Sequence, residues 1–216
     1  ELRVRGVLLG LSAVYVLGCA YRSWWPVFDV PRIVIVDSWL SSVLVGRSVA
    51  TLAELAFVAQ CALLLRSAAA AASHRAGGHL ASLLLPMALV AEACSWHAVL
   101  TTSNFGHFVE ESLWAAGALI WIVGVLLLIG RWPRRHRATI GACAIVALGY
   151  VLFMLTNDVP MYWARWQADE AAGMEGAGAI KRALRERLSG ETSSPAAGVS
   201  PCHADRNRPN YARIRA

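Results

Sequence analysis

Residues 113–137 read LWAAGALIWIVGVLLLIGRWPRRHR, and this stretch decides the class of fold. Its first eighteen residues include no charged side chain, and the next seven include four arginines. A helix rises about 1.5 Å per residue and the hydrocarbon layer of a bilayer is about 30 Å thick, so this run predicts a helix that crosses a membrane. The arginines after it predict a short loop on the cytoplasmic side.

The rest of the 216-residue chain has a similar composition. It is 57% hydrophobic and 16% charged, whereas an average soluble domain is about 25% charged. We therefore predict an all-α, polytopic helical membrane bundle with spans at residues 4–21, 48–65, 80–100, 109–130 and 138–156. The chain starts at Glu1 rather than at a methionine, so the number five applies to residues 1–216.

The segments around these spans predict the remaining organisation. Residues 1–166 are expected to form the transmembrane bundle, with a helix at 39–46 that either lies in the interface before the second span or continues into that span. Residues 167–188 could form an amphipathic helix, and residues 189–216 are rich in Ser, Pro, Gly and Arg, which predicts a disordered tail. Trp24 and Trp25 indicate an aromatic anchor after a true span, not the end of a cleaved signal peptide.

Arginines in the short loops predict the orientation. The 131–137 loop and the 66–79 loop contain arginine, whereas the 101–108 loop contains neither lysine nor arginine. Because basic residues favour the cytoplasmic side, we expect the N-terminus and the 131–137 loop to be cytoplasmic. The connector between the first two spans argues weakly against this orientation, since it contains Arg22, Arg32 and Arg47.

Ionisable residues inside the spans are the main indication of a site. Each costs about 2.5–3.5 kcal/mol on insertion scales, so it suggests a function. Glu54 lies in the second span, and Glu92 and His97 lie in the third. The predicted orientation places them in the outer half of the bilayer. The same layer is expected to contain His107, Glu110, Glu111 and Asp158.

Three kinds of chemistry fit carboxylates and imidazoles in such a layer. They are ligands of iron, manganese or zinc between helices, two histidines can ligate a haem, and the same groups can relay protons. No HExxH or ExxH motif is present, so the cofactor stays unknown, with a metal ion or haem as options. The catalytic candidates are Glu54, Glu92, His97 and Glu111, and the metal-ligand candidates are His97, His107, Glu92 and Glu110.

A structural explanation exists for each of these residues. Buried glutamates can hold neighbouring helices together as hydrogen-bonding groups. Glu110 and Glu111 could simply favour the positive end of a helix. His97 could bond a loop carbonyl at the interface. None of these explanations accounts for the residues' common position on one side of the membrane.

Three functions therefore stay open. The first is a membrane enzyme or redox protein with a His/carboxylate site in the outer half of the bilayer. The second is a non-catalytic membrane subunit or scaffold that uses buried acids for helix packing. The third, a small proton-coupled transporter, is disfavoured because a conduction path needs polar groups in both halves. The expected partners are the lipid bilayer and either another membrane protein or a second copy, and no nucleic acid.

Overall fold

The computed structural model describes residues 2–25, 27–28, 33–34 and 38–173. Its contacts divide the chain into two units, Glu1–Asp169 and Glu170–Ala216. In the second unit only residues 170–173 are described, and they are helical. The predicted amphipathic helix at 167–188 therefore lies mostly outside the described residues, and the predicted tail at 189–216 lies wholly outside them.

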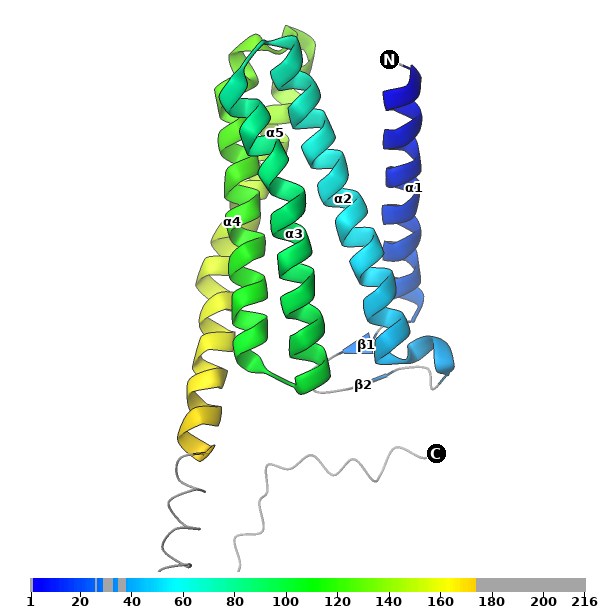
Figure 1. Cartoon of the computed structure of the whole chain (residues 1–216), viewed down its shortest axis with the longest axis vertical. Helices are drawn as coiled ribbons and strands as arrows, with labels where there is room; N and C mark the ends of the chain where they lie inside the picture. The colour runs from blue at the N-terminus through cyan, green and yellow to red at the C-terminus, as the bar shows by residue number, and fades with distance from the viewer. Residues whose placement is uncertain (1, 26, 29–32, 35–37, 174–216) are drawn as a thin grey trace, which may run out of the picture. The chain divides into compact units, whose positions relative to one another are not determined.

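The first unit is an all-α bundle (Figure 1). The long helices are α1 (Leu2–Trp24), α2 (Val43–Ala71), α3 (Arg75–Thr101), α4 (Asn104–Leu128) and α5 (Arg134–Phe153). In the described part of the chain, five helical segments are long and apolar enough to cross a membrane, as the sequence predicted. Each predicted span lies within one of these segments.

Short elements connect or extend the long helices. An antiparallel pair, β1 (Val27–Phe28) and β2 (Ile33–Val34), lies in the connector after α1. Where the sequence predicted an interfacial helix at 39–46, the structure has a single 3-10 turn, η1 (Trp39–Ser41), and α2 then begins at Val43. The position of this turn at a membrane interface stays a prediction.

Two further short elements lie around the fifth helix. A 3-10 turn, η2 (Ile129–Arg131), follows α4, and a π-helical segment, η3 (Met154–Asp158), follows α5. Helix continues after η3, so the whole run from Arg134 to Gly173 is helical over 40 residues. This is about twice the length that a single membrane crossing needs.

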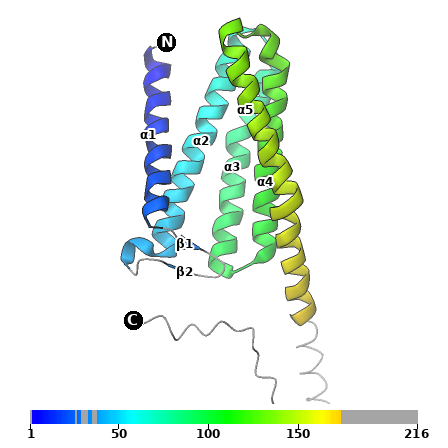
Figure 2. The same ribbon diagram turned by 180° about the vertical axis from the view of Figure 1, so that it is seen from behind.

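The helices run up and down in sequence order (Figures 1 and 2). Helix α1 packs against α2, α2 against α3, α3 against α4 and α4 against α5. The α2–α3 and α4–α5 turns lie at the same end of the bundle as the start of α1. The connector after α1 and the α3–α4 turn lie at the opposite end.

Local capping explains why the chain can turn so tightly. The side chains of Ser42, His74 and Ser103 each accept a hydrogen bond from a backbone N–H in the first turn of the following helix. At the α3–α4 turn, a Cβ on Gly106 would lie 2.8 Å from the Cβ of Ala98. Only glycine lets the two helices approach this closely.

The largest cluster of buried apolar side chains and the buried charged side chains lie in different halves of the bundle. The apolar cluster lies towards the end with the α2–α3 and α4–α5 turns, and includes Leu65, Leu84, Val125 and Leu128. The buried charged and imidazole side chains come instead from the helix ends near the α3–α4 turn. A site built from polar groups must therefore be sought in that second half.

Candidate functional site

Arg47 is the centre of a buried group of charged side chains. It lies in the second turn of α2 with only 9% of its surface exposed. Its Nη2 donates to Glu92 Oε2 at 2.9 Å, to Glu110 Oε1 at 3.3 Å and to Glu54 Oε2 at 3.5 Å. These carboxylates come from α3, α4 and α2, so one guanidinium joins three helices. We call Arg47 and these three glutamates the Arg47 cluster.

Helical spacing explains how α2 contributes to the cluster. Arg47, Thr51 and Glu54 are separated by four and three residues, which places them on one face of a helix. Thr51 also donates from Oγ1 to Glu92 Oε2 at 2.5 Å. Trp96 of α3 in turn donates from Nε1 to Thr51 Oγ1 at 3.0 Å. These bonds fix the position of Glu92 against α2.

His107 extends the cluster at the start of α4. Its Nδ1 lies 3.0 Å from Glu110 Oε2, one helical turn further on. Its ring stacks on Tyr162 with centroids 4.9 Å apart and an angle of 27° between the planes. Because an ionised carboxylate only accepts hydrogen bonds, Nδ1 is the donor when this contact is a hydrogen bond to ionised Glu110. His107 thus connects Glu110 to the helical segment after η3.

Arg22 forms the exposed edge of the same network. Its Nη1 lies 3.4 Å from Glu54 Oε1, and its side chain is 52% exposed. Glu54 therefore lies between two arginines, one exposed and one buried. Because Arg22 belongs to α1, the ion pairs reach the first four helices of the bundle.

Four buried polar atoms around the cluster have no hydrogen-bond partner among the described residues. They are Arg47 Nε, Glu92 Oε1, Ser95 Oγ and His107 Nε2. Buried polar atoms in proteins are nearly always paired, either with protein or with ordered water. Since both donors and acceptors are left over here, the group has hydrogen-bonding capacity for a small polar molecule such as water.

The structure brings together most of the residues that the sequence singled out. Glu54, Glu92 and Glu110 meet at Arg47, and His107 bonds to Glu110. Glu111 is half-buried, and its side chain makes no hydrogen bond or ion pair with any described residue.

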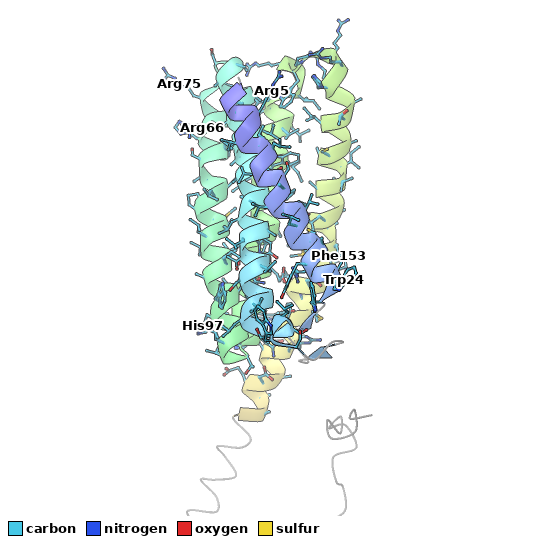
Figure 3. All side chains as sticks on the ribbon, turned by 90° about the vertical axis from the view of Figure 1, so that its right-hand side faces the viewer. Arg5, Trp24, Arg66, Arg75, His97 and Phe153 are labelled. Atoms are coloured by element: carbon cyan, nitrogen blue, oxygen red, sulfur yellow. The ribbon has the colours of Figure 1, made fainter. Side chains whose placement is uncertain are left out.

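His97 does not join the group. It is exposed, and its imidazole makes no hydrogen bond with any described residue. Its backbone carbonyl accepts a hydrogen bond from Thr101 Oγ1. Figure 3 shows it on the α3 ribbon near the end of the bundle that contains Trp24. Its predicted roles as a catalytic residue and as a metal ligand stay predictions, and they do not involve the Arg47 cluster.

The described residues do not fit the metal or haem that the sequence suggested. Among them, no group of three or more His, Cys, Asp or Glu side chains is arranged to hold a metal ion. The position that a cation would take between Glu54, Glu92 and Glu110 is occupied by the guanidinium of Arg47. Of the two histidines predicted as ligands, His97 is exposed, whereas His107 is buried and contacts Glu110 and Tyr162.

Sequence reasoning missed Arg47 as the central residue. The second span was predicted to start at residue 48, which left Arg47 as one of several arginines in a connector. The available signal was the spacing of Arg47, Thr51 and Glu54, because three polar residues on one helical face inside an apolar run indicate a buried partner.

In comparisons with known proteins, no family model, no curated protein and no solved structure matches this chain. The function has therefore to be inferred from the Arg47 cluster and from the membrane-like character of the helices.

Proposed function

We propose that the chain is an integral membrane scaffold or subunit, in which the Arg47 cluster joins helices in one half of the bilayer. The observation that supports this most directly is that one guanidinium bonds to carboxylates from three different helices. Two of these partners, Glu92 and Glu110, come from helices other than its own. This is the geometry of a joint between helices.

The surrounding lipid makes such a joint effective. In hydrocarbon there is little hydrophobic driving force between helices, so packing and polar contacts determine how they associate. A buried ion pair costs desolvation, but removal of one partner leaves an uncompensated charge and is strongly destabilising. The cluster therefore specifies one arrangement of α2, α3 and α4 over alternatives that would leave Arg47 unpaired.

We also propose the orientation of this joint. Arg5, Arg66 and Arg75 lie at one end of the bundle (Figure 3), the end with the α4–α5 turn, which contains four more arginines within 131–137. By the positive-inside rule this end faces the cytoplasm. The Arg47 cluster then lies in the outer half of the bilayer.

The four buried polar atoms that lack a hydrogen-bond partner among the described residues support a second possible function. In this alternative the cluster binds a small polar molecule or exchanges protons, and Glu92 and His107 are the groups that act on it. Glu92 Oε1 accepts and Arg47 Nε donates, so a molecule with one donor and one acceptor would satisfy both. This is the part of the enzyme hypothesis that needs no metal.

One experiment compares these functions. The triple variant Arg47→Met, Glu92→Met, Glu110→Met replaces the charged core of the cluster with apolar side chains of comparable length. For a joint, we expect the variant to stay folded in detergent and in bilayers, because apolar replacement of a buried ion-pair group is often neutral. The single variant Arg47→Met should instead unfold at a lower temperature than the triple variant.

The second function predicts a different result. A polar ligand would be retained by the wild-type protein and released by the triple variant, and extraction with organic solvent followed by mass spectrometry would detect it. A stoichiometric small molecule found only with the wild type would overturn the scaffold proposal. An Arg47→Met variant as stable as the wild type would show that the cluster does not hold α2, α3 and α4 together.

A further inference from the structure

A shallow cavity, largely open to the surroundings, lies at the opposite end of the bundle from the Arg47 cluster. It has a volume of about 390 Å³ and opens at the turn between α2 and α3. Its polar lining comes from Arg66 at the end of α2, from Ser73 and His74 in the turn, and from Arg75 at the start of α3. Its remaining wall consists of Ala69, Ala70 and Gly78.

The two arginines in this cavity have free charges. Neither Arg66 nor Arg75 makes an ion pair or a side-chain hydrogen bond with any residue that the structure describes. The sequence contains no Asp or Glu between Glu54 and Glu92, so no carboxylate of α2 or α3 lies near them along the chain. Their situation is the reverse of that of Arg47, whose charge is surrounded by carboxylates.

The backbone adds to the positive potential of the same cavity. Helix α3 begins at Arg75, and the first N–H groups of a helix form its positive end. His74 already caps one of them, because its Nδ1 accepts from the N–H of Gly77 at 3.0 Å. Arg75, the first residue of this helix, itself lines the cavity, so the positive end of α3 lies beside the two guanidinium groups.

We propose that this cavity binds the phosphate group of an anionic membrane lipid. Two guanidiniums beside the N-terminal end of a helix match the several acceptor oxygens of a phosphate. The cavity lies where two helices of membrane-spanning length end, which is the level of lipid headgroups. The small side chains of Ala69 and Ala70, with Gly78, leave an uncharged wall against which the glycerol part of a lipid fits.

Native mass spectrometry of the full chain in a non-ionic detergent tests the proposal. The protein is titrated separately with phosphatidylglycerol and with phosphatidylcholine. A basic residue near an anionic lipid strengthens binding by about fivefold, so two arginines predict a preference of about 25-fold for phosphatidylglycerol. The variant Arg66→Gln, Arg75→Gln should bind both lipids equally.

A matched control separates the cavity from general charge attraction. Arg131 and Arg134 are also exposed, lie in the α4–α5 turn at the same end of the bundle, and make no ion pair among the described residues. The variant Arg131→Gln, Arg134→Gln should keep the full preference. An equal loss in both double variants, or no preference in the wild type, would overturn the proposal.

Two further measurements keep the result interpretable. Inorganic phosphate added at constant ionic strength should not displace phosphatidylglycerol, and displacement would show a site for soluble phosphate instead of lipid. If the glutamine pair does not fold, the single variants Arg66→Gln and Arg75→Gln are titrated instead. Each should lose about fivefold of the preference, and two unaffected single variants would contradict the proposal.

Discussion

Arg47 Nη2 and Glu92 Oε2 lie 2.9 Å apart, although the two residues are separated by 45 positions in the sequence. The contact joins α2 to α3 in a part of the bundle where both side chains are more than nine-tenths buried. Glu92 is further held by Thr51, so its carboxylate has little freedom to turn away. This pair is the shortest of the three ion pairs that Arg47 makes in the cluster.

Arg47→Met should be strongly destabilising. The substitution leaves Glu92 and Glu110 buried without their cation, which typically costs about 3–5 kcal/mol. Thermal unfolding of the purified protein in detergent would measure the loss. Arg66→Met is the control in the same helix, because Arg66 is exposed and unpaired among the described residues, and its effect should stay within about 0.5 kcal/mol.

A double-mutant cycle should show coupling between Arg47 and Glu92. With Arg47→Gln, Glu92→Gln and the double variant, we expect a coupling energy of about 0.5–3 kcal/mol, because the two residues share one buried contact. The comparison cycle is Arg22 with Glu54, where Arg22 is 52% exposed. Exposed pairs typically contribute about 0–1 kcal/mol, so a larger coupling there than at Arg47 would contradict this account of the cluster.

His107→Phe should lower stability while keeping the ring against Tyr162. The substitution removes the contact between Nδ1 and Glu110 Oε2 but retains an aromatic ring for stacking. Removal of one partner of a buried hydrogen bond costs about 1–3 kcal/mol. His97→Phe is the control, and because His97 is exposed we expect no comparable loss. Equal effects at both positions in a denaturation series would argue against a role for His107 in the cluster.

Gly106→Ala should destabilise the α3–α4 turn. The new Cβ would lie 2.8 Å from the Cβ and 3.1 Å from the Cα of Ala98, and the second of these is backbone that cannot move aside easily. Overpacking of this kind typically costs about 1–3 kcal/mol. Gly149→Ala has no atom within 4 Å of its new Cβ and should be neutral or stabilising, since alanine favours helix. The melting temperatures of the two variants give the comparison.

The orientation can be read by cysteine labelling in intact cells. In a chain whose five native cysteines are replaced by alanine, Thr102→Cys should react with a membrane-impermeant maleimide, because the α3–α4 turn is expected to face outwards. Arg135→Cys should react only after the membrane is opened. The opposite pattern would place the Arg47 cluster in the inner half of the bilayer and would reverse the proposed orientation.

Much of the candidate site was predictable because an ionisable residue within an apolar helix costs free energy in any fold, and therefore indicates a specific role. Glu54, Glu92 and Glu110 could be identified in this way, and the loop arginines predicted that they share one side of the membrane. His97 was predicted on the same basis but is exposed. Position along a helix predicts depth, whereas the direction of a side chain also depends on how the helix is rotated in the bundle.

The sequence by itself determined the number of helices that are long and apolar enough to span a membrane, and the division between an arginine-rich end and an acidic half. Both follow from the length and composition of single segments. These two properties do not depend on how a segment packs in the fold. Only the tertiary structure decided that Arg47 is the centre, that its guanidinium lies between three glutamates, and that His107 is included while His97 is not. Those results depend on distances between helices, which packing sets and which no single segment contains.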